Sequence, residues 1–262
     1  MSDRRRRQKE LRKAKREAER KQAARRELVR RITTALLFGL VVVAIFALSS
    51  LSGPGEGELP ATYEDYREQP AACGATAPPP EEVMTFEAPE PQTDITPESK
   101  VIATLTTSCG DIVIELDPAS SPETVSSFVF LARQGYYDGQ VFHRIAKGFV
   151  IQGGDPNANG SGGPGYIVPD EFPDDDFVYE VGVVAMANRG AGSTGSQFFI
   201  VIGEDARFLT NTFNVLGRVI SGQETLDRIT EVPTRASPGS VEESLPLESV
   251  YIESVTIEVT NS

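Results

Sequence analysis

Histidine and cysteine are scarce in this chain of 262 residues, and tryptophan is absent. One histidine and two cysteines cannot supply the several ligands that a zinc site or an iron–sulfur cluster requires. The composition therefore excludes a self-contained zinc enzyme and an iron–sulfur protein, and we expect no metal and no other cofactor. Cys73 and Cys109 fit either a disulfide or two free thiols, because sequence alone carries no geometry.

Strong compositional bias is also missing. Hydrophobic residues make up 39% of the chain and charged residues 24%, with 23 Gly and 18 Pro, which is close to average usage. These values exclude a collagen, a coiled coil throughout and a chain that is disordered throughout. A chain of this length can bury a sizeable core in one ordinary domain with appendages.

Basic residues are few outside the first 31 positions. Residues 1–31 contain 15 Lys and Arg against 5 Asp and Glu, whereas the other 231 residues contain 10 against 33. Binding to the phosphates of nucleic acid requires clustered Lys and Arg. We therefore expect no nucleic-acid partner for the acidic part of the chain.

An uncharged stretch, residues 32–51, follows the basic arm of residues 1–31. A helix of this length spans about 30 Å, the thickness of the hydrocarbon core of a membrane. Its polar residues lie at the ends, whereas a buried core helix would carry a polar stripe. A cleaved signal peptide is the competing interpretation, but it would have a shorter basic region and a small-residue cleavage site. We expect a single-pass transmembrane signal anchor in the cell membrane, with the arm in the cytoplasm and the rest of the chain outside.

Residues 52–96 are rich in proline and in acidic residues, with ten Asp and Glu against the single basic residue Arg67. Proline interrupts any helical or strand period, and like charges repel one another. We expect this segment to be a flexible linker that builds no core and holds the domain of residues 97–262 clear of the membrane.

The sequence of residues 97–262 predicts a compact, strand-rich domain. Two β-branched runs, 101–107 and 112–116, are separated by Ser-Cys-Gly-Asp and predict a hairpin. Ser121 and Pro122 predict a helix that begins with a capping serine. Further strands are expected around residues 141–152, 181–187, 197–202, 213–220 and 250–259, and a second helix over residues 223–230. Many short strands with two helices favour a barrel or a sandwich.

Two motif matches within residues 155–166 lead to no ligand site. Residues 160–165 have the spacing G-x-G-x-x-G, but Pro164 prevents the helix start that a pyrophosphate needs. Asp155 begins a run that imitates an EF-hand, but Tyr166 stands where that calcium loop requires a bidentate Glu. We expect an ordinary loop in both cases.

Four separated motifs carry the functional signal. His143 has no nucleophile near it in sequence, so we interpret it as a packing or hydrogen-bonding residue and not as a general base. The motifs are Val141-Phe-His-Arg144, Gly148-Phe-Val-Ile-Gln-Gly-Gly-Asp155, Ala185-Met-Ala-Asn188 and Gly195-Ser-Gln-Phe-Phe-Ile200. With these motifs in this order, the chain from about residue 101 to residue 259 resembles the cyclophilins, a family of peptidyl-prolyl cis-trans isomerases.

The resemblance implies a mainly β fold, a closed eight-stranded antiparallel barrel with two helices and a site in a groove on its outer face. It makes Arg144, Phe149 and Gln152 the catalytic residues. It assigns the substrate-binding positions to Val150, Ala187, Asn188, Gln197, Phe199, Phe208, Leu209 and Phe213. Three of these depart from the family pattern, since Val150 replaces a methionine, Phe208 the tryptophan of many eukaryotic members, and Phe213 their histidine. The replacements bear on affinity for cyclosporin more than on catalysis.

This set of residues suits rotation about X-Pro bonds, which needs neither a nucleophile nor a transferred proton. Arg144 is expected to donate to the imide as its nitrogen becomes pyramidal, while apolar side chains hold the proline ring. Gln152 and the backbone of Asn188 are expected to hold the peptide. We therefore expect an isomerase that acts on proline-containing segments of exported proteins. The alternative is a non-catalytic barrel that grips proline segments as a holdase or scaffold.

Overall fold

The computed structural model describes residues 62–80, 82–236 and 240–261. The predicted cytoplasmic arm (residues 1–31), the predicted membrane span (32–51) and the start of the predicted linker (52–61) lie outside the described residues. Among the helices of the described residues, none is both long enough and apolar enough to cross a membrane.

The described residues form three α-helices, two short 3-10 helices and ten strands. In chain order these are α2 (Tyr63–Glu68), η1 (Ala72–Gly74), β1 (Lys100–Thr107), β2 (Gly110–Leu116), α3 (Pro122–Arg133), β3 (Arg144–Ala146), β4 (Val150–Gly153), β5 (Val183–Met186), β6 (Phe198–Val201), η2 (Glu204–Phe208), β7 (Val215–Ser221), α4 (Gln223–Glu231), β8 (Thr234–Ala236), β9 (Glu243–Pro246) and β10 (Ile252–Thr260).

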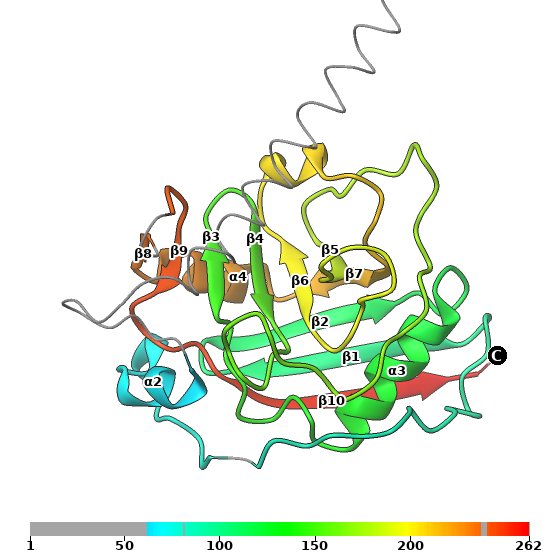
Figure 1. The fold of residues 1–262 in the computed structure, drawn as a ribbon, viewed down its shortest axis with the longest axis horizontal. Helices are drawn as coiled ribbons and strands as arrows, with labels where there is room; N and C mark the ends of the chain where they lie inside the picture. The colour runs from blue at the N-terminus through cyan, green and yellow to red at the C-terminus, as the bar shows by residue number, and fades with distance from the viewer. Residues whose placement is uncertain (1–61, 81, 237–239, 262) are drawn as a thin grey trace, which may run out of the picture. The chain divides into compact units, whose positions relative to one another are not determined.

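Eight of the strands form one antiparallel sheet in the order β10-β1-β2-β7-β5-β6-β4-β3. In Figure 1 the strands β1, β2 and β10 run across the upright strands β3, β4 and β6, so that the sheet curls on itself. The edge strands β3 and β10 share no ladder within the described chain. The segments that directly precede these two strands are joined by an isolated bridge between Val141 and Tyr251 and by a 2.9 Å hydrogen bond from Phe142 N to Val250 O. The expected closed barrel is therefore a curled half-barrel, because β3 has only three residues and pairs with β4 alone.

Helix α3 begins at Pro122, as predicted, but the predicted serine cap is wrong. Ser121 makes no side-chain hydrogen bond to the helix. The carboxylate of Glu171, from a distant loop, instead accepts hydrogen bonds from Glu123 N (3.0 Å) and Thr124 N (2.8 Å). A negative charge at a helix N-terminus is favourable because the first N–H groups lack partners in the helix. The cap is thus supplied by tertiary structure.

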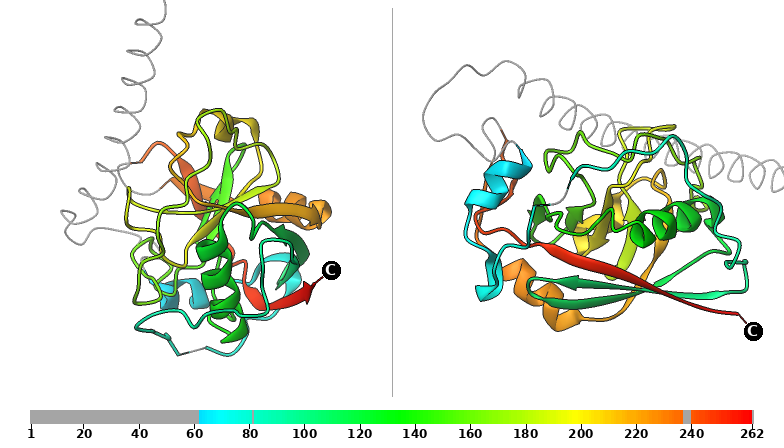
Figure 2. Two further views of the ribbon diagram at one scale, coloured as in Figure 1. Left: turned by 90° about the vertical axis from the view of Figure 1, so that its right-hand side faces the viewer. Right: turned by 90° about the horizontal axis from the view of Figure 1, so that it is seen from below.

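The number of helices differs from the expected two. Helix α4 matches the second predicted helix, but α2 lies in the stretch that was expected to be a linker. Thr62 and Asp65 form a capping box at its start, in which Thr62 Oγ1 accepts from Asp65 N and the Asp65 carboxylate accepts from Thr62 N. Helix α2 lies beside the β8–β9 hairpin in Figure 1 and in the right-hand view of Figure 2.

The main core lies between the sheet and helices α3 and α4. Alternate residues of β1 are fully buried, namely Val101, Ala103 and Leu105, as the two-residue period of a strand requires. Phe128 of α3 packs edge to face on Phe198 of β6, with ring centroids 5.9 Å apart. Because Phe198 points into this core, its neighbours in β6 point to the opposite face of the sheet.

The described part of the predicted linker packs against the domain. Tyr66 and Ala72 are 1% and 0% exposed, and Phe86 packs edge to face on Phe130 of α3 with centroids 5.0 Å apart. The expectation that this segment builds no core is therefore wrong for residues 62–80 and 82–96. Isolated apolar side chains between the prolines make these contacts, although the average composition is acidic and polar.

A disulfide joins Cys73 to Cys109 in the turn between β1 and β2. Of the two interpretations left open by the sequence, the structure has the cross-link. A disulfide stabilises a protein mainly by restricting the unfolded chain, and a loop closed over a sequence separation of 36 residues corresponds to about 4 kcal/mol in the chain-entropy account.

We predict that replacing both cysteines by serine lowers the free energy of unfolding by about 2–5 kcal/mol. Urea denaturation followed by circular dichroism measures this change against the oxidised wild type. The double variant and the reduced wild type should agree. Unchanged unfolding midpoints in both would contradict a stabilising cross-link.

Candidate active site

Strands β4, β5 and β6 carry apolar side chains on both faces of the sheet. On β6, Phe198 and Ile200 belong to the main core, whereas Phe199 and Val201 belong to a separate apolar cluster. Successive side chains of a strand point to opposite faces, so the two clusters lie on opposite sides of the sheet. We call the separate group the second cluster; its members are Val150, Tyr179, Val183, Ala185, Phe199, Val201 and Ala206, with partly buried Phe149, Phe177, Ala187, Leu209, Phe213 and Val215 against them.

The second cluster brings together six of the predicted site residues from several parts of the chain. They come from the turn before β4, from β4 itself, from β6, and from the loops after β5 and η2. These six are Phe149, Val150, Ala187, Phe199, Leu209 and Phe213. The structure therefore collects most of the predicted substrate-binding positions on one face of the sheet.

Tyr179, which the sequence motifs do not include, anchors Phe213 in this cluster. Phe213 packs edge to face on Phe199, with centroids 5.5 Å apart and rings at 89°. Tyr179 is 1% exposed; its hydroxyl donates to Phe213 O (2.7 Å) and accepts from Phe213 N (3.2 Å). The sequence signal for it is the alternation of aromatic residues at 177 and 179, which is too short to distinguish a site residue from a core residue.

The turn between β3 and β4 positions Phe149. A hydrogen bond from Phe149 N to Ala146 O (3.0 Å) closes this turn, and Gly148 has a φ of 78°, in the left-handed region that favours glycine. Gly203 lies so close to Gly148 that a Cβ at position 203 would overlap the Gly148 carbonyl. The single strand expected over residues 141–152 is therefore two strands, because this turn interrupts it.

Arg144 begins β3 and lies opposite Gln152 of β4 in the antiparallel register. The carbon of its guanidinium lies 5.3 Å from the centroid of the Phe149 ring, which is a cation–π arrangement. Its Nη1 points to Gln152 Oε1 at 3.4 Å. The three residues predicted to be catalytic thus lie together at the edge of the second cluster, because one hairpin holds all of them.

A chain of side-chain amides continues from Gln152. Its Nε2 donates to Gln197 Oε1 (3.0 Å), and Gln197 Nε2 donates to Gly162 O (3.0 Å). Each amide accepts on one side and donates on the other, so the same chain of hydrogen bonds defines the orientation of both. Gln197, predicted to bind substrate, therefore also holds the Gln152 amide in place.

Glu242, which lies in none of the predicted motifs, pairs with Arg144. Its two carboxylate oxygens accept from Arg144 Nε (2.8 Å) and Nη2 (2.9 Å). Burial alone would raise the pKa of Glu242, but the hydrogen bonds and positive charge of Arg144 outweigh it and hold that pKa below its ordinary value. Sequence reasoning missed this residue because no motif surrounds it and because the β8–β9 hairpin next to it was not expected.

Asn188 and Phe208 lie at the margin of the predicted site. Asn188 Nδ2 donates to Thr212 O (2.7 Å), so its side chain holds the loop that leads into Phe213. Phe208 ends η2 with 86% of its surface exposed and lies outside the second cluster. Its neighbour Leu209 packs against the second cluster.

His143 is buried beside Arg144, in agreement with a packing role. Its exposed fraction is 8%, and Tyr66 of α2 donates to its backbone oxygen (2.9 Å). Burial lowers the pKa of His143 to about 4, with the charge of Asp155 opposing and that of Arg144 adding to the effect. The imidazole is therefore uncharged at neutral pH.

The carboxylate of Asp155 is fully buried and accepts hydrogen bonds from the backbone of the loop that follows it. It accepts hydrogen bonds from the backbone N–H groups of Asn157 (2.8 Å), Asn159 (3.1 Å), Gly160 (2.5 Å) and Gly162 (2.9 Å). These donors surround the oxygens that an EF-hand would offer to calcium. In the described part of the chain, no group of three or more His, Cys, Asp or Glu is placed to hold a metal ion.

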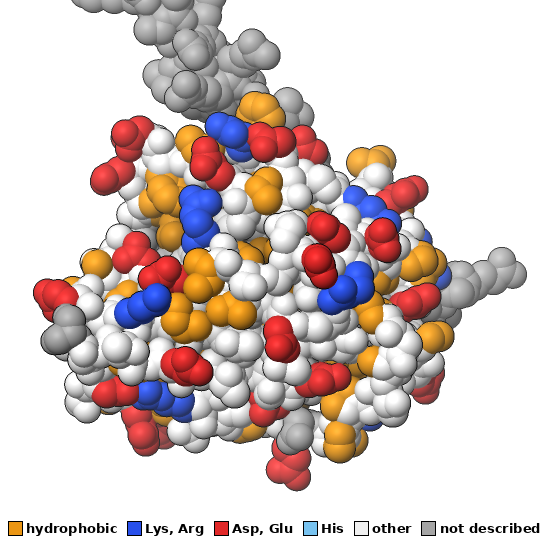
Figure 3. Space-filling model, turned by 180° about the vertical axis from the view of Figure 1, so that it is seen from behind, with side chains coloured by type: hydrophobic (Ala, Val, Ile, Leu, Met, Phe, Trp, Pro, Cys, Tyr) orange, Lys and Arg blue, Asp and Glu red, His pale blue; other side chains and the backbone are white. Residues whose placement is uncertain are grey.

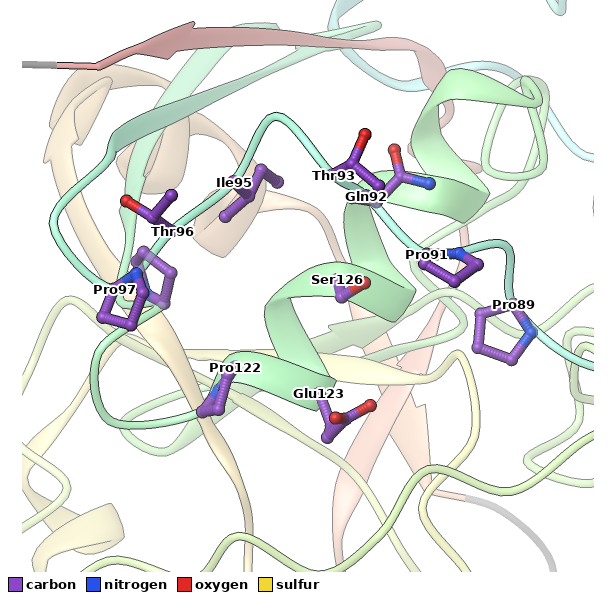
Figure 4. A pocket seen from close by; sticks show the side chains of 11 residues that line it. Pro89, Pro91, Gln92, Thr93, Ile95, Thr96, Pro97, Pro122, Glu123 and Ser126 are labelled. Carbon is purple, nitrogen blue, oxygen red and sulfur yellow. The ribbon is translucent and has the colours of Figure 1, made fainter.

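A pocket lies elsewhere on the molecule, between the 89–97 segment and the first turns of α3. Figure 4 shows that the side chains around it are mostly prolines and small polar groups. It is lined in part by Pro89, Pro91, Pro97, Pro122 and Glu123, and by none of the predicted site residues.

Charged side chains are mixed on the face opposite to that of Figure 1. Figure 3 shows single Lys and Arg side chains among Asp and Glu side chains on this face. Nucleic-acid backbones bind to clustered positive charge. The face shown therefore gives no support to a nucleic-acid partner.

Comparison with known proteins identifies the relatives of this chain. The model of the family described as cyclophilin type peptidyl-prolyl cis-trans isomerase/CLD matches residues 102–257. Peptidyl-prolyl cis-trans isomerase B of Streptomyces anulatus is 41% identical over 176 residues, which cover 61% of this chain and 97% of that protein. Peptidyl-prolyl cis-trans isomerase A of Mycobacterium tuberculosis is 39% identical over 177 residues, which cover 62% and 94% of the two chains.

Solved structures show the same similarity. The crystal structure of a cyclophilin type peptidyl-prolyl cis-trans isomerase from Cryptosporidium parvum has a TM-score of 0.54 and 29% identity, covering 63% of this chain and 99% of that chain. A second crystal structure of that protein, in the presence of the dipeptide Ala-Pro, has a TM-score of 0.54 and 30% identity, covering 61% and 99%.

Proposed function

This chain belongs to the cyclophilin type peptidyl-prolyl cis-trans isomerases and is an enzyme of that class, and we propose that it works by Arg-assisted, non-covalent catalysis at the second cluster. The observation that carries the proposal is the position of Arg144. Its guanidinium lies over the Phe149 ring, next to Gln152, at the edge of an apolar surface. A charged donor beside apolar side chains suits a substrate that combines an apolar ring with peptide carbonyls.

Each predicted residue has a distinct role in this proposal. Arg144 donates to the imide nitrogen as it becomes pyramidal, and Gln152 and the backbone of Asn188 hold the flanking peptide. Gln197 keeps the Gln152 amide oriented. The proline ring packs on side chains of the second cluster, namely Phe149, Val150, Ala187, Phe199, Leu209 and Phe213, and exposed Phe208 contacts the residues that flank the proline.

The free energies involved show that a hydrogen bond from Arg144 alone cannot account for the acceleration. The barrier to rotation is about 18–20 kcal/mol, and an acceleration of about 10^5 requires about 7 kcal/mol. One hydrogen bond to a charged group contributes about 1.5–3 kcal/mol. The remainder must come from positioning the peptide on a preformed surface from which water is excluded.

Proline-containing segments of exported proteins are the proposed substrates. The relative from Cryptosporidium parvum was crystallised in the presence of Ala-Pro, which supports recognition of proline next to a small residue. The proposed location follows from the uncharged residues 32–51 and the basic arm before them, which favour a span with the enzyme domain outside the cell. The Cys73–Cys109 disulfide supports this location, because such bonds persist in oxidising compartments.

Replacing Arg144 tests the mechanism. We predict that Arg144→Ala lowers kcat/KM on a proline peptide by about 10- to 150-fold, the equivalent of one charge-assisted hydrogen bond. A protease-coupled isomerisation assay on the full chain measures this change. Circular dichroism verifies that the variant is folded.

Arg218→Ala serves as the matched control, because Arg218 is an exposed arginine on β7 outside the second cluster. Its activity should equal that of the wild type. A folded Arg144→Ala variant with near-complete activity would refute the mechanism. A wild type that binds proline peptides without accelerating their rotation would instead be a holdase or scaffold.

The pH dependence of catalysis forms a second test. With a pKa lowered to about 4 by burial, His143 is uncharged throughout pH 6–9, and burial raises the pKa of Tyr179 to about 12. Neither group changes its charge in this interval, and no proton is transferred in the mechanism. We predict a nearly constant kcat/KM between pH 6 and pH 9. A bell-shaped profile, or a single step near the ordinary histidine pKa, would indicate acid–base catalysis.

The proposed anchor is tested by cell fractionation. The full chain should sediment with membranes and resist extraction by alkaline carbonate, whereas a chain lacking residues 32–51 should be released. A chain lacking only residues 1–31 is the control that keeps the span. Recovery of the full chain in the soluble fraction would exclude the anchor.

A further inference from the structure

Glu242 makes the most extensive polar contact with the proposed catalytic arginine, although none of the family motifs includes it. Both of its carboxylate oxygens accept hydrogen bonds from the Arg144 guanidinium, at 2.8 Å from Nε and 2.9 Å from Nη2. Parallel hydrogen bonds of this kind define the plane of a guanidinium as well as its position. The pair is partly shielded, with side-chain exposed fractions of 27% for Arg144 and 38% for Glu242.

Glu242 contacts only one edge of the guanidinium and leaves Nη1 to other partners. Glu242 takes the edge formed by Nε and Nη2, while Nη1 points toward Gln152 Oε1 at a long 3.4 Å. The guanidinium also lies over the Phe149 ring. Contacts from three directions therefore hold the group with Nη1 toward Gln152, next to Phe149 at the edge of the second cluster. A substrate carbonyl or imide nitrogen would replace the weak bond to Gln152.

The position of Glu242 is itself well defined. It directly precedes β9, which pairs with β8 and packs beside β3, the strand that carries Arg144. Leu245 of β9 packs against the group around Tyr66, and Ser249 N donates to Pro70 O (2.9 Å). The hairpin is thus supported by the α2 segment, which the disulfide ties to the domain.

We propose that Glu242 is a positioning residue for the isomerase reaction, which holds the Arg144 guanidinium with its Nη1 edge toward the bound proline peptide. This inference rests on the proposed role of Arg144. The lowered pKa of Glu242 supports it, because the carboxylate is then charged and able to pair at neutral pH. Glu242 contributes to kcat through Arg144 and not by touching the substrate.

Glu242→Gln is the test, because it keeps the shape of the side chain but removes the charge and one of the two acceptors. We expect kcat to fall by about three- to tenfold while KM changes less than about twofold, as for an interaction that is needed only in the transition state. Glu243→Gln is the matched control, since Glu243 is the next residue and is exposed on β9. It should leave kcat unchanged.

A double-mutant cycle shows whether Glu242 acts through Arg144. Lysine cannot form the two-pronged contact, so in the Arg144→Lys background Glu242→Gln should change kcat by less than about twofold. An equal loss in both backgrounds would show a merely structural role and overturn the proposal. An unchanged or increased kcat for Glu242→Gln in the wild-type background would overturn it as well.

A spectroscopic measurement on the wild type tests the proposal independently of how the variants fold. The Nε–H group of Arg144 should show the restricted motion of a rigid group in 15N relaxation, and Glu242→Gln should increase its motion. A mobile Nε–H in the wild type would contradict the proposal. Full activity of Arg144→Ala would refute the proposed mechanism, and the role of Glu242 with it. If Arg144→Ala loses activity but the Glu242 variants do not behave as expected, only the role of Glu242 is refuted.

Discussion

The antiparallel pairing of β3 with β4 is the constraint on which the site depends. It places Arg144 opposite Gln152 and Ala146 opposite Val150, and the turn between the strands carries Phe149. A slip of one residue in this register would turn each side chain to the other face of the sheet and separate the arginine from the second cluster. The pairing of β4 with β6 continues the same register to Phe199. One short hairpin therefore positions all three residues of the proposed catalytic step.

The fold stabilises this hairpin on both of its faces. Ile145 and Ile151 are fully buried in the main core, and each such side chain contributes about 1.5–3 kcal/mol by its burial. Val150 is buried on the opposite face, in the second cluster. At the open edge of β3, Tyr66 holds the backbone of His143, and the β8–β9 hairpin packs alongside. Such a rigid frame suits a reaction in which no bond is made or broken, because its catalysis depends on donors and surfaces that are already in place.

Local patterns predicted the strand regions of the main sheet, α3 and α4, because each pattern lies within one element, but not α2 or the β8–β9 hairpin. The site residues were assigned through the resemblance of four short motifs to the cyclophilins. Alternation in Gly195-Ser-Gln-Phe-Phe-Ile200 is enough to place Phe199 on one face and Phe198 on the other. Contacts between residues far apart in the sequence could not be predicted from local patterns. Glu171 caps α3, and Glu242 pairs with Arg144, from loops that carry no periodic signal. The burial of Tyr66 was likewise not predicted, because residues 52–96 are acidic and rich in proline on average. Its burial depends on a surface that forms only on folding.

The structure of the protein with a bound proline peptide would test the central claim most directly. The account predicts that the pyrrolidine ring packs on the second cluster beside Phe149 and Phe199, with Arg144 Nη1 about 3 Å from a polar atom of the X-Pro unit. A peptide bound instead in the proline-lined pocket beside α3, with the guanidinium of Arg144 directed into solvent, would contradict it.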